Sequence, residues 1–292
     1  MKTEIKYSKH IDLVFHALAH MHVNNASDCF DRSYIDIMEK RKTNTDFDLL
    51  SEINCLEQYY NDNFDRVMLI NFLPFYSNSL DEMKEIYLNC SAFTDTDRDA
   101  FIRPFISLLE KEAAFYFDYW QGRYYETAYH RQSAESRLRK ELDKYACIFD
   151  YFKKSVLAYL SFSITKNGRG FSGIGSRFTA LAPFPVKEDD FDNTFFTLLH
   201  EYTHQFTDEL LQAEINMADG THDISENVVI LADYYLIKAA DHSSTERYLG
   251  WLADKSGNGH RKLSEADFLG IFRVDEGLRS RLLELVGAVT KS

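Results

Sequence analysis

The spacing of hydrophobic residues predicts helices along most of the chain. Apolar side chains recur every three or four residues in segments 10–23, 46–89, 101–120 and 123–157, which is the spacing of one face of an α-helix. Gly122 follows the third segment and is expected to mark the end of that helix. The first half of the chain is therefore predicted to be mainly helical.

A strand-like pattern follows the helical segments. Residues 157–164 alternate apolar and small polar side chains, residues 166–170 supply turn residues, and residues 171–182 resume the pattern. This order predicts a β-hairpin and a fold that is mostly α with a small β-sheet, of the α+β class. We expect a helical N-terminal region, residues 1–156, packed as one compact unit with a second region, residues 157–292.

The second region carries a His-Glu-x-x-His motif in an apolar run that Asp192 is expected to cap. On a helix, His200 and His204 lie one turn apart on the same face, so two imidazoles can bind one metal ion. Zinc prefers such ligands and makes its bound water acidic near neutral pH. Glu201 is then placed to act as the general base. The alternative is a core helix whose histidines have this spacing by chance.

The third metal ligand has two candidates. Glu226 follows His204 by 22 residues, which is enough for a helix, a turn and the start of a second helix that packs back. However, Asp223 and Glu226 also have the spacing of a capping box, which would pair Glu226 with backbone amides. Asp233 is the other candidate, either as the ligand itself or as a partner that orients a ligand histidine.

Residues 193–240 resemble the active-site region of the zinc metallopeptidases of the thermolysin-like, or gluzincin, group. In that group a His-Glu-x-x-His helix precedes a second helix that bears a glutamate ligand. The resemblance implies a zincin-like fold, one Zn²⁺ per chain and hydrolysis of a peptide or related amide bond. One departure is clear, because Ile230 stands where that group has an acidic residue one turn after the glutamate ligand.

The resemblance also implies helpers around the metal. Groups that stabilise the oxyanion of the reaction are expected nearby, and the candidates are Tyr234, placed among the catalytic residues, and His222, Tyr235 and His242. In these peptidases a strand upstream of the zinc helix borders the cleft and can pair with an extended substrate. Gly168, Gly170, Gly173 and Gly175 would let a backbone approach such a strand closely, unless they belong to an ordinary edge strand.

A second group of histidines lies near the N-terminus. His16 and His20 are also one helical turn apart, with His22 two residues further on. They could hold a regulatory metal, but histidines on a helix are more often paired within the protein. A catalytically inactive zincin-like fold that acts as a binding or structural module is the alternative to an enzyme.

Charge and composition limit the expected partners. The net charge of −13 argues against nucleic acid or an anionic membrane surface, and leaves a peptide or protein as the expected substrate. The four cysteines are far apart, so neither a disulfide framework nor a thiolate zinc site is expected. The segment from Ile11 to Val23 is too polar for a signal peptide, which favours a cytoplasmic protein. The oligomeric state is left open.

Overall fold

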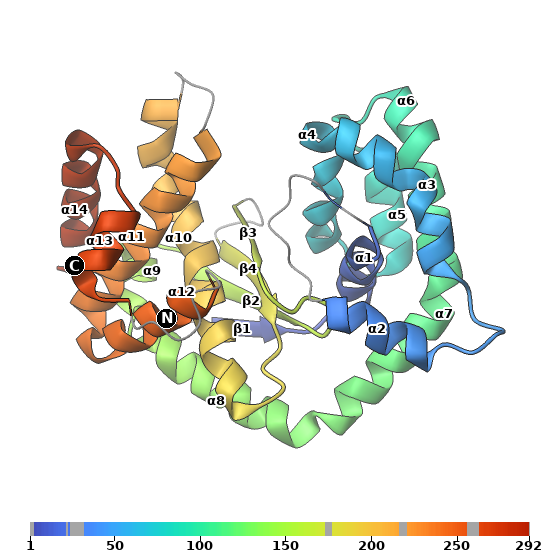
Figure 1. Ribbon diagram of the computed structural model, residues 1–292, viewed down its shortest axis with the longest axis horizontal. Coiled ribbons are helices and arrows are strands. Elements are labelled where there is room, and N and C mark those ends of the chain that lie inside the picture. Colours follow the sequence, from blue (N-terminus) through green and yellow to red (C-terminus); the bar gives the residue numbers. More distant parts are fainter. Residues whose placement is uncertain are drawn as a thin grey trace.

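The computed structural model describes residues 3–21, 23, 32–172, 177–215, 221–255 and 263–291. Helices dominate it and a small sheet lies between them, which confirms the predicted α+β class (Figure 1). The strands are β1 (Thr3–Lys6), β2 (Ser155–Ser161), β3 (Arg169–Ser172) and β4 (Arg177–Pro183).

The helices fall into two groups along the chain. The first group comprises α1 (Lys9–Ala19), α2 (Arg32–Arg41), α3 (Leu49–Asp62), α4 (Phe64–Val67), α5 (Leu80–Asn89), α6 (Asp95–Asp97), α7 (Arg103–Glu126), α8 (Ala128–Asp143) and α9 (Ala146–Tyr151), with the 3₁₀ helices η1 (Met68–Asn71) and η2 (Leu73–Tyr76) and the π-helix η3 (Arg98–Ile102). The second comprises α10 (Phe191–Ile215), α11 (Thr221–Ala240), α12 (Thr245–Lys255), α13 (Glu265–Ile271) and α14 (Glu276–Thr290), with η4 (Glu188–Asp190) and η5 (His242–Ser244).

The sheet has the strand order β1-β2-β4-β3. Strands β1, β2 and β4 are parallel, with Thr3 opposite Val156 and Val156 opposite Phe178. Strand β3 runs antiparallel to β4 and places Gly170 opposite Ala180. The expected hairpin is therefore formed by β3 and β4. The prediction that the strand near residue 157 would be the first strand of this hairpin is wrong. Strand β3 comes between β2 and β4 in the chain and runs antiparallel to β4, whereas β2 is parallel to β4.

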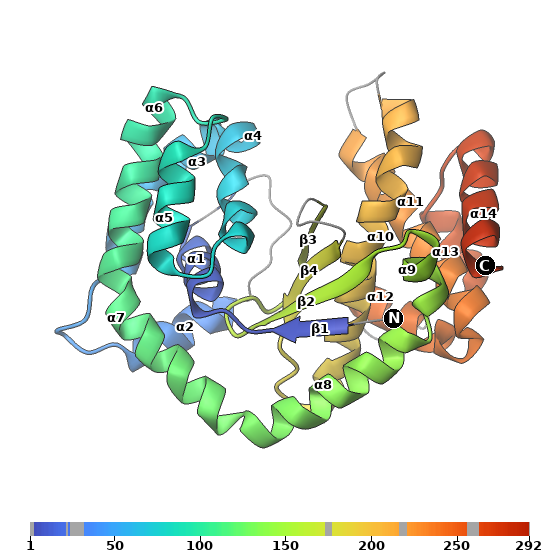
Figure 2. The ribbon, with the colours of Figure 1, turned by 180° about the vertical axis from the view of Figure 1, so that it is seen from behind.

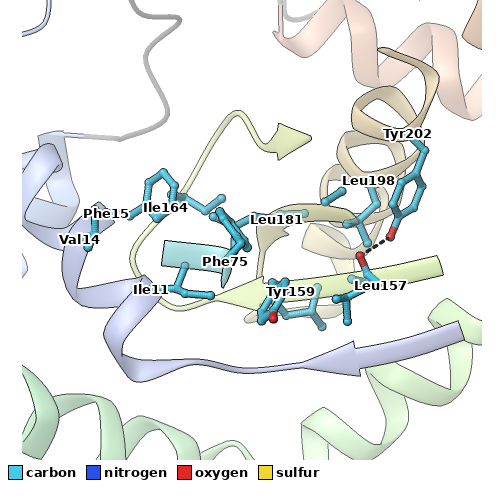
Figure 3. Close-up of a cluster of buried hydrophobic side chains, with 14 of the residues drawn as sticks. Ile11, Val14, Phe15, Phe75, Leu157, Tyr159, Ile164, Leu181, Leu198 and Tyr202 are labelled. Atoms are coloured by element: carbon cyan, nitrogen blue, oxygen red, sulfur yellow. Dashed lines mark hydrogen bonds between the residues drawn. The ribbon is translucent and has the colours of Figure 1, made fainter. Parts of the chain in front are cut away.

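Both faces of the sheet are covered, which is usual where parallel strands lie at its centre. Gly170 of β3 faces α10 on one face of the sheet. On the other face, the next residue, Phe171, contacts Phe72 just before η2 and Phe75 within η2. Figure 3 shows part of this core, in which the hydroxyl of Tyr202 on α10 donates to the carbonyl of Leu157 on β2 at 3.2 Å.

Most helices of the two groups stand on opposite sides of the sheet, but α9 lies beside α14 of the second group. Helices α2 to α6 gather on one side and α10 to α14 on the other, and α7 and α8 pass below the sheet from one side to the other (Figures 1 and 2). Because β1 pairs with β2, the sheet takes a strand from near the N-terminus as well as the strands that follow residue 154.

Two expected helix boundaries are wrong. Gly122 lies inside α7, which continues to Glu126, and nothing lies within 4 Å of where a side chain at this glycine would begin. Helix α10 already begins at Phe191, so Asp192 sits in its first turn rather than capping it, and its carboxylate accepts hydrogen bonds from Arg247 of α12. A glycine inside a helix costs only about 1 kcal/mol relative to alanine, so α7 can continue past Gly122.

Candidate metal centre

The His-Glu-x-x-His motif lies in the middle of α10, which packs against the sheet and against α11. His200 is almost completely buried, and the side chain of His204 is 26% exposed. Their Nε2 atoms are 3.2 Å apart, so both imidazoles point at the same place, as the one-turn spacing predicts.

Glu226 on α11 faces this pair of imidazoles. Its Oε2 lies 3.4 Å from Nε2 of His200, and its Oε1 lies 3.3 Å from Nε2 of His204. One ligand atom from each of the three residues lies within 4.8 Å of the others, and the three could hold a metal ion. No other group of three or more such side chains with this geometry occurs in the described part of the chain. Because α11 is already helical at Thr221, Glu226 lies within the helix and its carboxylate is directed at the imidazoles.

Asp233 binds the far side of the His200 ring. Its Oδ2 is 2.9 Å from Nδ1 of His200, while Nε2 of the same ring points to Glu226. Asp233 follows Glu226 by seven residues, which places it two turns further along the same helix face. This geometry makes Asp233 the partner that orients His200 and leaves Glu226 as the third candidate ligand.

The carboxylates around His200 strongly favour positive charge on that ring. Burial by itself would lower the pKa of His200, but hydrogen bonds to Asp233 and Glu226 raise it to about 10. Burial would likewise raise the pKa of Glu226, but hydrogen bonds from His200 and His204 hold it well below its usual range. The donor set therefore stabilises a cation at the point where the imidazoles and the carboxylate meet.

Tyr248 on α12 extends this arrangement and was not predicted. Its buried hydroxyl lies 3.3 Å from Oδ2 of Asp233 and 3.2 Å from the carbonyl oxygen of Ile230. Tyr248 comes 15 residues after Asp233, in an amphipathic helix with no recognisable motif. Only the packing of α12 against α11 brings the hydroxyl to the carboxylate, so sequence spacing offered no signal.

Glu201 lies next to His200 on α10 and is half-buried. Its negative charge contributes to the raised pKa of His200, so its carboxylate acts on the centre electrostatically. The backbone of β3 packs tightly against Glu201. An ideal Cβ at Gly170 would lie 2.4 Å from the carbonyl oxygen of Glu201, and one at Gly168 would lie 2.9 Å from its Cγ. The close backbone approach expected at these glycines is made by α10. Gly173 and Gly175 lie outside the described residues.

The other proposed helpers lie in different surroundings. The hydroxyl of Tyr234 is 3.2 Å from Nζ of Lys238, and its ring packs on Phe268 with the ring centroids 4.6 Å apart. The hydroxyl of Tyr235 accepts a hydrogen bond from Nε of Arg279, and His242 is exposed in η5.

No hydrogen bond or ion pair joins any of these three residues to His200, His204 or Glu226 in the described part of the chain. The side chain of His222 lies outside the described residues.

The histidines of α1 are paired within the N-terminal helices. His16 bonds Tyr34 through Nδ1 at 2.9 Å and Glu112 through Nε2 at 2.8 Å. His20 Nδ1 bonds the carbonyl of His16 at 2.8 Å. These contacts favour paired histidines over a regulatory metal site, and His22 lies outside the described residues.

Comparisons with known proteins found no matching protein-family model, no similar curated protein and no similar solved structure. Within the described residues, every helix is too short or too polar to cross a lipid bilayer.

Proposed function

We propose that this protein is a zinc-dependent metallopeptidase with a zincin-like fold. The observation that carries the proposal is the convergence of His200, His204 and Glu226 from two helices on one point, with Glu201 beside it. Two imidazole nitrogens and one carboxylate oxygen form the donor set of catalytic zinc sites, which keep a fourth position for water or substrate.

Glu201 and Asp233 have different roles in the proposed hydrolysis. When bound, zinc would supply Lewis-acid chemistry and lower the pKa of water at the site. Glu201 accepts a proton from the attacking water and returns it to the nitrogen that leaves when the amide bond breaks. Asp233 accepts the Nδ1 proton of His200, which fixes the ring with Nε2 toward the ligand position.

The decisive experiment compares zinc-loaded wild-type protein with Glu201→Gln on a mixed peptide library read by mass spectrometry. We expect peptide cleavage by the wild type and a loss of about 10²–10⁴-fold in the variant, because only the proton acceptor is removed. Metal analysis should find one zinc per chain in both proteins. Glu126→Gln is the matched control, since Glu126 is a surface residue paired with Arg123.

Two results would contradict the proposal. Full activity in Glu201→Gln would remove this residue from catalysis. Zinc bound at one per chain without cleavage of any peptide would instead favour the alternative, a zincin-like binding or structural module.

A further inference from the structure

A close backbone contact near the candidate centre joins Gly170 of β3, and Gly168 just before β3, to α10. Beyond the contact already described, an ideal Cβ at Gly170 would lie 2.9 Å from Cβ of Glu201. One at Gly168 would also lie 2.6 Å from Cγ2 of Thr197 and 2.5 Å from the carbonyl oxygen of Leu181. Real Cβ atoms do not approach other atoms this closely, so neither position admits a side chain unless β3 or α10 moves.

The two glycines face the same helix. An ideal Cβ at Gly170 in β3, or at Gly168 just before β3, would lie against Glu201 of α10. One limits the position of the Glu201 side chain at Cγ, and the other limits its backbone. Pairing of Gly170 with Ala180 fixes β3 on the sheet behind this contact.

A second contact holds Glu201 from the helix side. The side-chain amide of Gln205 donates to the carbonyl oxygens of Glu201 and Thr179, each at 2.9 Å, and its carbonyl accepts from the Thr179 N–H at 3.2 Å. Thr179 belongs to β4, so the backbone of Glu201 is connected to the same sheet that carries β3. His200, by contrast, is oriented by Asp233 of α11.

We infer that Gly168 and Gly170 are positioning residues for Glu201, with the β3 backbone setting where the water-activating carboxylate lies. This inference rests on the proposed function. According to this inference, two parts of the fold support the centre. The sheet positions the base Glu201, and α11 together with α12 positions the metal ligands. A change at the glycines should therefore alter the catalytic rate far more than zinc affinity.

The test is Gly170→Ala, with Gly122→Ala as the matched control, because a Cβ at Gly122 meets nothing within 4 Å. In Gly170→Ala we expect kcat to fall by about 10- to 100-fold, since displacements of about 1 Å have effects of this size. KM and zinc affinity, the latter from competition with a chelator, should change less than about threefold, because the ligand atoms of His200 and His204 face Glu226 of α11 and not β3. Amide hydrogen exchange over residues 197–205 of the zinc-free protein should become faster. Gly122→Ala should match the wild type in all four measurements.

Four outcomes test the inference separately from the proposed function. Unchanged kcat and unchanged exchange in Gly170→Ala would overturn it, as would a loss of activity that only follows a loss of zinc. If Gly170→Ala does not fold, a crystal structure of the zinc-bound wild type decides, because Cγ of Glu201 must remain in contact with Gly168. If the wild type cleaves no peptide, the proposed function fails, while exchange, zinc affinity and the crystal structure still test whether β3 positions Glu201.

Discussion

Two helices of this protein carry histidines at the same spacing, with different results. The rings of His16 in α1 and of His20, which caps the end of α1, have centroids 4.7 Å apart, and in α10 the rings of His200 and His204 have the same separation. The first pair is buried among the N-terminal helices, and the second meets Glu226 from a neighbouring helix. The spacing brings two imidazoles together in both helices, and the surroundings decide what they can bind.

The surroundings also set opposite protonation behaviour. Burial lowers the pKa of His16 well below its usual value, and the nearby charges of His20 and Lys42 lower it further. Lys42 also donates to Glu112, so an ammonium group already shares the carboxylate that His16 contacts. At His200 the carboxylates outweigh burial and raise the pKa. A pair of histidines becomes a candidate metal centre where one carboxylate faces the Nε2 atoms of both rings, as Glu226 does here.

The largest expected effect separates the two pairs directly. His204→Ala should reduce zinc affinity by more than about 100-fold, because it removes a metal ligand. Loss of a residue that only hydrogen-bonds to a ligand costs up to about 100-fold. His16→Gln should still bind one zinc per chain, with a loss of about 1–3 kcal/mol in the free energy of unfolding because Glu112 and Tyr34 lose a partner. Metal analysis and urea unfolding measure both. A loss of zinc in His16→Gln, or a second zinc in the wild type, would show that the α1 pair binds metal after all.

Asp233→Asn should have the next largest effect. The carboxylate that holds Nδ1 of His200 is replaced by an amide of nearly equal size, so the ring loses its charged partner while the packing is kept. We expect zinc affinity to fall by about 10- to 100-fold, measured by chelator competition. Asp254→Asn on α12 is the control, since Asp254 is an exposed residue outside the ligand group. Equal affinities in the two variants would show that Asp233 does not support the centre.

The dependence of zinc binding on pH tests the contrast in protonation. Because the pKa of His200 is raised to about 10, the metal-free protein carries a proton there at neutral pH that zinc must displace. Zinc affinity should therefore rise about tenfold per pH unit between about pH 6 and 9 for one released proton, as calorimetry in buffers of different ionisation enthalpy can measure.

The raised pKa of His200 also determines how the stability of the metal-free protein depends on pH. The contribution of His200 to the stability of the metal-free protein is complete below its unfolded pKa of 6.5 and is lost as the pH rises through 10. Zinc binding that is independent of pH over this range would contradict the role given to the carboxylates.

Tyr248→Phe should have the smallest effect. It removes one hydroxyl that contacts Asp233 but leaves the carboxylate in place, so zinc affinity should fall about three- to tenfold. Tyr87→Phe is a matched control, because it removes a buried hydroxyl that donates to the carbonyl of Ile70 in the N-terminal helices. A similar change in zinc affinity in both variants would show that Tyr248 acts only through general stability.

The candidate site was more predictable than the sheet that supports it. The motif on α10 and a carboxylate on α11 follow from helical periodicity, and the structure brings the three side chains together. The direction of β2 relative to β4 was not predictable, because strand pairing joins residues far apart in sequence and one short extra strand reverses the outcome. The same limit hid Tyr248, whose role depends on how α12 packs.

Taken by itself, the sequence determined which residues share a helix face, since 3.6 residues per turn place His16 with His20 and His200 with His204 in the same way. It also determined that helices would predominate. Tertiary structure alone decided which pair meets a carboxylate that faces both rings, and which is enclosed by a hydroxyl and an acid that Lys42 already contacts. The physical reason is that a ligand's protonation and access depend on burial and on charges from other elements, and local spacing contains neither.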